Sequence, residues 1–251
     1  MRVSTEQRTA FARDGYLVLR GLFTPQEIAS AGVAIDELAA RPPSIGNEMV
    51  YFEDSVTHPA VRVLSRIERF LDRSAGLRAL ILDPRLTETT GELFGEPAAL
   101  FKEKINFKVP GGRGFEAHQD IQPGWDAYAD YFLSALVTID PSTVANGCLE
   151  LAAGHHRRGL LGEKWKPLTP AQLKGVEFRV LPTEPGDVVF FDCFVPHRSA
   201  PNLTERPRRN LYLSYNRRSA GVHREKYFMD KRAAFPPDFE RAAGARYEFK
   251  V

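Results

Sequence analysis

The sequence predicts a mainly β protein, a sandwich or barrel with α-helices packed against its outside. From residue 100 onward the chain is a series of short β-like runs separated by turns, whereas the first hundred residues show helical apolar spacing. No repeat, low-complexity tract or linker divides the 251 residues, and 43% hydrophobic residues can bury one sizeable core. We therefore expect one domain over residues 1–251, with a helical flank at about 1–99, a β core at about 100–218 and a C-terminal extension at 219–251.

The N-terminal flank is expected to contain four helices and one β run. Residues 5–14 follow a hydroxyl cap and predict a helix, and the apolar run at 15–21 is bounded by glycines. Thr24 followed by Pro25 marks the start of a second helix, which continues through Leu38. The polar residues 44–58 are predicted to be a mobile loop. Two further helical segments are expected at 60–73 and 76–94, the second broken near Pro84.

The core is expected to be built from short strands. In residues 101–109, Phe101, Ile105 and Phe107 alternate with lysines and an asparagine, so the two sets are predicted to lie on opposite faces. His197 is expected to end the strand at 188–194, with Arg208 or Arg209 on an antiparallel neighbour. The other β runs are 115–125, 131–139, 148–152, 178–181 and 210–216.

Charge and targeting signals exclude several classes of protein. The 34 Lys and Arg against 32 Asp and Glu give a net charge of +2, which does not indicate a nucleic-acid or membrane-surface protein. Cys148 and Cys193 lie in apolar runs and are expected to be buried free thiols. Without a signal-like apolar segment near the N-terminus or a run of 18 apolar residues, we expect a soluble, cytoplasmic protein. Its oligomeric state is left open.

A possible metal site lies between a Gly-rich turn and a Pro-Gly turn. His118 and Asp120 are two residues apart, so on an extended chain their side chains point the same way. Two histidines and one carboxylate, with coordination positions left open, form the ligand set of non-haem Fe(II) oxygenases. His197 is the best candidate for the third ligand. Alone, each of these residues also fits an ordinary turn or a core hydrogen bond.

Six motifs follow one another along nearly the whole chain: Asp-Gly-Tyr-Leu-Val-Leu-Arg-Gly at 14–21, Lys-Val-Pro-Gly at 108–111, His-Gln-Asp at 118–120, Asn-Gly-Cys-Leu-Glu at 146–150, Pro-Gly-Asp at 185–187 and the segment 197–208. In these motifs and in their order, the chain resembles the phytanoyl-CoA dioxygenase family of Fe(II)/2-oxoglutarate-dependent oxygenases. The one clear departure is at 152–156, where Ala-Ala-Gly-His-His replaces the family's Pro-Gly-Ser-His, so these paired histidines are interpreted as loop residues.

The resemblance implies a double-stranded β-helix, that is, a cupin-like jelly roll with flanking helices. It implies His118, Asp120 and His197 as Fe(II) ligands, and the use of 2-oxoglutarate and O2. A distal carboxylate of 2-oxoglutarate needs a fixed bidentate cation, which arginine offers and lysine does not. The family implies Arg208 for this role, while Arg209 points the other way. Weaker candidates for the co-substrate or substrate pocket are Ser199, Thr138, Lys104 and Asn106.

The function implied is hydroxylation of an unactivated C–H bond of a small molecule, with decarboxylation of 2-oxoglutarate to succinate. Lys102, Lys104 and Lys108 share one face of a strand and, with Arg217 and Arg218, suggest an anionic substrate such as a carboxylate, phosphate or phosphonate. A row of lysines also fits an exposed face or a protected edge. The same iron centre could perform desaturation, epoxidation or ring formation. The alternatives from other classes are a non-catalytic β-barrel binding protein and a Zn(II) hydrolase.

Overall fold

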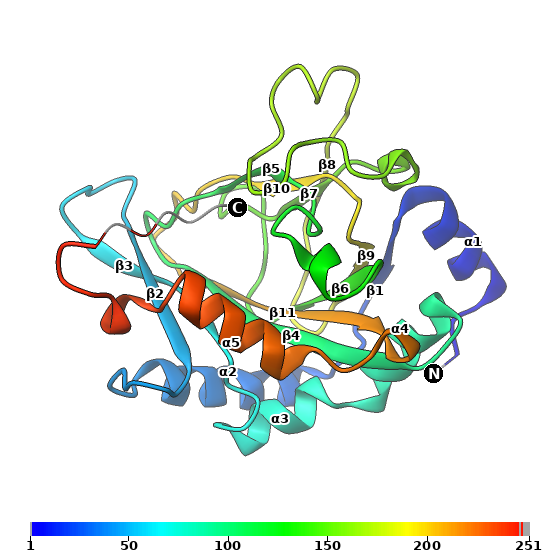
Figure 1. Ribbon diagram of the computed structural model, residues 1–251. Coiled ribbons are helices and arrows are strands. Elements are labelled where there is room, and N and C mark those ends of the chain that lie inside the picture. Colours follow the sequence, from blue (N-terminus) through cyan, green and yellow to red (C-terminus); the bar gives the residue numbers. More distant parts are fainter. Residues whose placement is uncertain (1, 246, 248–251) are drawn as a thin grey trace.

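A computed structural model describes residues 2–245 and 247 of the chain. Two antiparallel sheets face each other, and helices cover the outside of the larger one (Figure 1). The mainly β, jelly-roll prediction is confirmed.

The elements run in the order α1 (Thr5–Asp14), β1 (Tyr16–Leu19), α2 (Pro25–Ala39), β2 (Met49–Asp54), β3 (Arg62–Glu68), α3 (Ala75–Ile81), α4 (Pro84–Phe94), β4 (Ala98–Lys108), β5 (Phe115–His118), η1 (Trp125–Ala127), β6 (Phe132–Thr138), β7 (Leu149–Leu151), η2 (His155–Arg158), β8 (Arg179–Leu181), β9 (Val188–Asp192), β10 (His197–Ser199), β11 (Arg208–Arg217), η3 (Arg218–Ala220), α5 (Arg224–Ala234) and η4 (Asp238–Glu240).

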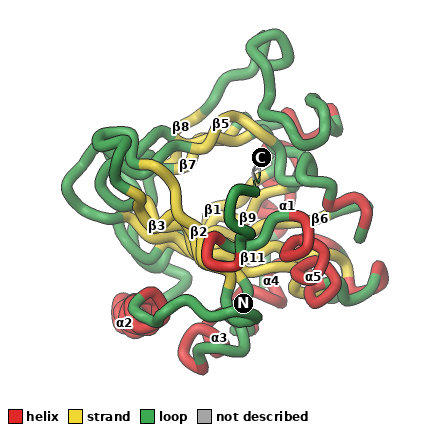
Figure 2. The backbone as a smooth tube through the Cα atoms, turned by 60° about the vertical axis from the view of Figure 1, so that its left-hand side comes forward, coloured by secondary structure: helices red, strands yellow, loops and turns green. Residues whose placement is uncertain are grey.

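The larger sheet has the order β1-β9-β6-β11-β4-β3-β2, and the smaller has the order β5-β10-β7-β8. Figure 2 shows the two sheets as the walls of a barrel. The outer face of the larger sheet packs against α2, α3 and α4 through apolar side chains such as Ile35, Ile81, Ile105 and Leu213. Its inner face is largely polar, because the alternating positions of β4 and β11 carry lysine, asparagine, serine and arginine. No helix in the described part of the chain is long and apolar enough to cross a membrane.

Two segments of the N-terminal flank were predicted wrongly. The expected loop at 44–58 contains strand β2, and the expected helix at 60–73 contains strand β3, which pairs with β4. The apolar residues at 63, 64, 67, 70 and 71 have helix-like spacing, but pairing with β4 outweighs it. On β3, Arg66 and Glu68 point toward the polar interior. In the sequence, these charged residues resembled the solvent-facing side of a helix.

A bulge also changes the predicted alternation in β4. Ser214 pairs with Lys102 but Tyr215 pairs with Leu100, so Phe101 is an extra residue in the ladder. Phe101 therefore packs with Trp125 and Phe132 in a second apolar cluster rather than beside Ile105. The rest of the predicted alternation is confirmed.

The β run expected at 188–192 is confirmed as β9, but the strand does not continue to Phe194 and His197 does not end it. The chain then turns, with the Val195 amide donating to the Asp192 carbonyl, and crosses to the smaller sheet. His197 consequently begins β10, whose neighbours are β5 and β7. Arg208 lies on β11 in the larger sheet, whereas His197 lies on β10 in the smaller sheet. The two residues therefore belong to facing walls of the barrel.

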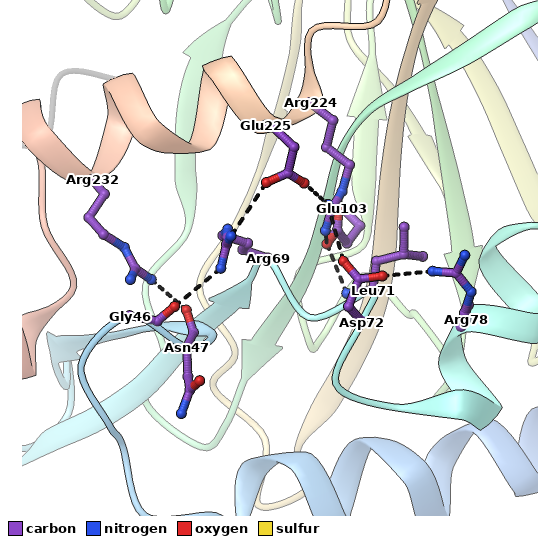
Figure 3. A network of polar contacts seen from close by, with 10 residues as sticks. All are labelled: Gly46, Asn47, Arg69, Leu71, Asp72, Arg78, Glu103, Arg224, Glu225 and Arg232. Carbon is purple, nitrogen blue, oxygen red and sulfur yellow. Dashed lines mark hydrogen bonds and ion pairs between the residues drawn. The ribbon is translucent and has the colours of Figure 1, made fainter.

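Helix α5 is fastened to the sheet by a buried ion pair. Arg224 Nε lies 2.8 Å from Glu103 Oε2, and the Leu71 amide donates to Glu103 Oε1 at 3.0 Å. Figure 3 shows how Arg69 extends this network, contacting the Gly46 carbonyl and Glu225. The network fixes the helix that carries Tyr227 and Lys231 against β3 and β4.

We predict that Glu103→Leu lowers the free energy of unfolding by up to about 3–5 kcal/mol, because the Arg224 guanidinium loses its buried counter-ion and keeps only the exposed carboxylates of Glu225 and Asp72. Urea unfolding measures this change. The matched control is Glu163→Gln, which breaks an exposed pair with Lys166 and should cost less than about 1 kcal/mol. Equal effects of the two substitutions would contradict the structural role given to the Glu103–Arg224 pair.

Candidate active site

The structure brings together His118, Asp120 and His197. His118 ends β5 and pairs in register with His197 at the start of β10, with their ring centroids 4.2 Å apart. Asp120 lies in the turn after β5, and its Oδ1 is 3.7 Å from His197 Nε2. One ligand atom from each residue lies within 4.8 Å of the others. This is the grouping expected from the sequence.

Neighbouring groups orient all three side chains. The Nδ1 atoms of His118 and His197 donate to the carbonyls of Glu116, at 2.7 Å, and Val195, at 3.0 Å, which leaves each Nε2 free to bind a metal. Ser134 Oγ donates to Asp120 Oδ2 at 2.5 Å. Hydrogen bonds of this kind hold metal-binding side chains in place and fix their tautomers.

The protonation states also suit a cation. Burial, reinforced by the neighbouring His197, lowers the pKa of His118 to about 3, so its imidazole is neutral. Burial alone would raise the pKa of Asp120, but His197, His118 and the Ser134 hydroxyl hold it below its usual value. Neutral imidazoles and an ionised carboxylate are the forms that bind a divalent metal. Two histidines and one carboxylate fit Fe(II) with positions left for other ligands.

Arg208 lies on the inward face of β11, opposite Lys108. This side chain is buried, its Nη2 donates to the Gly147 carbonyl at 2.8 Å, and its Nε has no hydrogen-bond partner among the described residues. Lys108 donates to Ser199 Oγ at 2.7 Å and to the Ala200 carbonyl. No carboxylate in the described part of the chain forms an ion pair with Arg208 or Lys108. The Arg208 guanidinium therefore suits a carboxylate ligand such as the distal end of 2-oxoglutarate.

The other residues singled out in the sequence are distributed around the interior. Thr138 is buried and donates to Thr183 Oγ1 at 2.8 Å, and it pairs across the sheet with Asn210. Asn106 is buried opposite Asn210, with its Oδ1 unpartnered among the described residues. Arg209 points outward, as predicted, and contacts Asp140 and Asp36.

Two arginines suggested from the sequence lie away from this interior. Arg217 packs over the Tyr131 ring and approaches Glu96, and Arg218 is exposed, so this pair does not extend the lysine row. His155 and His156 lie in the short helix η2 and do not belong to the metal-binding group, in agreement with their interpretation as loop residues.

The lysine row lies on neither an exposed face nor an edge. β4 is paired on both sides, with β11 and β3, and Lys102, Lys104 and Lys108 point inward. Lys104 Nζ lies 5.0 Å from the ring centroid of Tyr212 and 5.6 Å from that of Phe115, which shares β5 with His118. Burial, together with Lys102, lowers the pKa of Lys104 to about 7.

Sequence reasoning missed four interior residues that complete this charged wall. Arg66 Nε lies 2.9 Å from Glu68 Oε1 on β3, and Lys231 of α5 also contacts the Glu68 carboxylate. Tyr227, one helical turn before Lys231, faces Lys102. Because a helix was predicted at 60–73, the inward direction of Arg66 and Glu68 was missed. The sequence contained no signal that the C-terminal extension returns to the barrel.

Two glutamines fasten the loop at 159–168 beside the metal-binding segment. Gln119 donates to the carbonyls of Gly159 and Phe194 and accepts from the Leu161 amide at 2.7 Å. Gln122 donates to the carbonyls of Glu163 and Lys166. Since both glutamines flank Asp120, the segment that carries the ligands also holds the loop that borders the site.

Comparison with known proteins agrees with this geometry. A model of the family described as "Phytanoyl-CoA dioxygenase (PhyH)" matches residues 11–210. The chain belongs to the phytanoyl-CoA dioxygenase family. It is therefore an oxidoreductase that uses Fe(II), 2-oxoglutarate and O2, and the binding-protein and zinc-hydrolase alternatives are set aside.

Several characterised relatives of this dioxygenase are similar over nearly their whole length. The chain is 37% identical to a 2-aminoethylphosphonate dioxygenase from an uncultured bacterium, covering 96% of this chain and 92% of the relative. It is 36% identical to a methylphosphonate hydroxylase from Gimesia maris, covering 93% and 88%. A crystal structure of EctD from S. alaskensis with 2-oxoglutarate and 5-hydroxyectoine superposes with a TM-score of 0.75 at 29% identity, covering 87% of this chain and 78% of that one.

We predict that Arg208→Met weakens 2-oxoglutarate binding by roughly 10- to 150-fold, the effect of losing about 1.5–3 kcal/mol of charged hydrogen bonding. Anaerobic titration of the Fe(II)-loaded dioxygenase with 2-oxoglutarate measures the dissociation constant. Arg209→Met is the matched control, because the neighbouring side chain points outward to Asp140, and it should leave this constant nearly unchanged. If both variants bound 2-oxoglutarate as the wild type does, Arg208 would not be the clamp.

Proposed function

We propose that this dioxygenase hydroxylates a C–H bond of a small phosphonate, with His118, Asp120 and His197 as the iron ligands and Arg208 as the clamp for 2-oxoglutarate. Lys108 and Ser199 would assist Arg208, and Thr138 and Asn106 would line the same polar wall. The overall reaction consumes the substrate, 2-oxoglutarate and O2 and yields the alcohol, succinate and CO2. When bound, the iron supplies the oxidation of the C–H bond.

One observation carries the choice of substrate class. Lys104 points into the interior between Tyr212 and Phe115, which shares β5 with His118, and its ammonium forms neither an ion pair nor a hydrogen bond within the described residues. Glu68 and Asp120 offset only part of the cost of burying this charge, so the pKa of Lys104 is lowered by its burial. An anionic ligand removes that cost, and a phosphoryl group offers up to two negative charges and three acceptor oxygens.

The names of the two relatives above support a phosphonate within the anionic class. Both are named for phosphonates, and each covers more than nine-tenths of this chain. No feature of the described residues favours desaturation, epoxidation or ring formation at the same centre.

The chain's own residues then position the substrate and keep water away. Lys104 lies between Tyr212 of the larger sheet and Phe115 of the smaller one, so an anion bound to it lies between the two walls. The loop fastened by Gln119 and Gln122 borders the site, and Trp165 of this loop packs over Gly124. Such enclosure favours charge–charge contacts because it lowers the local dielectric.

The test is succinate release on incubation with methylphosphonate or n-propylphosphonate, Fe(II), 2-oxoglutarate and O2, with the hydroxylated product identified by mass spectrometry. We expect succinate and hydroxylated product in equal amounts. Lys104→Met should raise KM for the phosphonate at least about tenfold, the effect of losing one charged contact. Succinate release that no phosphonate stimulates would refute the proposed substrate class.

The pH dependence offers a separate prediction. Lys104 binds an anion as the ammonium, and its pKa of about 7 means that this form is lost as the pH rises through neutrality. KM for the phosphonate should therefore increase from pH 6.5 to pH 8.5, while Lys104→Arg, which keeps its charge throughout, should flatten the profile. Identical profiles for the wild type and Lys104→Arg would exclude Lys104 titration as the cause.

A further inference from the structure

One end of the polar interior is aromatic, and Lys102 occupies it. The Lys102 ammonium lies 4.8 Å from the ring centroid of Trp125 and 5.5 Å from that of Tyr227. Phe101 and Phe132 pack against the same rings, with 5.3 Å between the centroids of Phe101 and Trp125 and 4.5 Å between those of Phe101 and Tyr227. Faces of tryptophan and tyrosine at such distances attract a cation through their ring quadrupoles. This aromatic cluster thus already holds a cation of the protein itself.

The position of Lys102 is set from three sides. Its backbone is locked in β4 opposite Ser214, Trp125 lies in η1 just after the metal-binding segment, and Tyr227 comes from α5. Helix α5 is itself fastened to β4 through Arg224 and Glu103. The ammonium is therefore a fixed part of the wall.

The carboxylates that face this interior have other partners. Asp120 belongs to the candidate metal centre, and its Oδ2 accepts from Ser134. Glu68 is engaged by Arg66 and by Lys231. Asp192 accepts from the Tyr131 hydroxyl and the Phe194 amide. These three carboxylates are thus already engaged, and the Trp125 and Tyr227 rings already face the Lys102 ammonium.

We propose that Lys102 is a specificity-determining residue that selects phosphonates with an uncharged far end and rejects those with a terminal ammonium. The inference rests on the proposed function and deepens it. A substrate ammonium would have to displace Lys102 from the aromatic cluster or lie close to it, and like charges in a poorly solvated site repel strongly. An alkyl chain of the same length would pack against the edges of the Trp125 and Tyr227 rings. It would neither displace Lys102 nor bring a second positive charge close to it.

Two isosteric probes separate these cases. n-Propylphosphonate and 2-aminoethylphosphonate differ only in a terminal methyl or ammonium group. For the Fe(II)- and 2-oxoglutarate-loaded enzyme, we expect kcat/KM to be at least about tenfold higher with n-propylphosphonate, which corresponds to 1.4 kcal/mol. In Lys102→Met, which keeps the length of the side chain but removes its charge, the ratio should fall to about one or below.

The control is Lys226→Met, the same substitution on the outer side of α5, where Lys226 pairs with Asp230. Its ratio should equal that of the wild type. Lys102→Gln is a second substitution, which removes the charge but keeps a polar side chain. The Fe(II)–2-oxoglutarate absorption band reports whether each variant still binds iron and 2-oxoglutarate.

The outcomes are distinguishable. If the wild type uses 2-aminoethylphosphonate at least as well as n-propylphosphonate, the selection inference is wrong and the proposed function stands. If the wild type prefers n-propylphosphonate but both Lys102 variants keep that preference, another residue makes the selection and the role of Lys102 is refuted. If neither phosphonate is hydroxylated, the proposed function fails and the inference fails with it.

Discussion

The pairing of β4 with β11 is the constraint on which the interior depends. Its register places Lys108 opposite Arg208, Lys104 opposite Tyr212 and Lys102 opposite Ser214. Both strands lie in the middle of the seven-stranded sheet, so their inward side chains cannot turn to solvent. Alternate side chains on a strand are about 7 Å apart. A single strand thus places lysines beside Arg208, near the candidate metal centre and at the aromatic end of the interior.

The buried cations of the interior fall into two groups, those that pair with a carboxylate and those that have no carboxylate partner among the described residues. Glu68 compensates Arg66 and Lys231, and Glu103 compensates Arg224, so these groups stabilise the wall and helix α5. Arg208 and Lys104 form no ion pair with a carboxylate among the described residues. Under the proposed function, 2-oxoglutarate and the substrate supply the counter-charges at these two positions.

The sequence predicted which three residues lie together at the candidate metal centre, but it did not predict the strand pairing that forms the charged wall. His118, Asp120 and His197 lie in short motifs whose order is typical of the family, and the structure brings them together as expected. The wall depends on long-range pairing. The charged face of β3 resembled a helix, the bulge at Phe101 moved a ring into the second cluster, and α5 returns to the barrel from the C-terminal extension. Such features arise from tertiary contacts that local spacing does not encode.

We propose above all that Lys104 on β4 binds the phosphonate group of the substrate beside the iron. An anaerobic crystal structure of the Fe(II) enzyme with 2-oxoglutarate and methylphosphonate tests it most directly. We predict that His118, Asp120 and His197 bind the iron, that Arg208 contacts the distal carboxylate of 2-oxoglutarate, and that the phosphonate oxygens lie within hydrogen-bonding distance of Lys104 Nζ. A phosphonate bound elsewhere, with Lys104 still unpaired, would contradict the account.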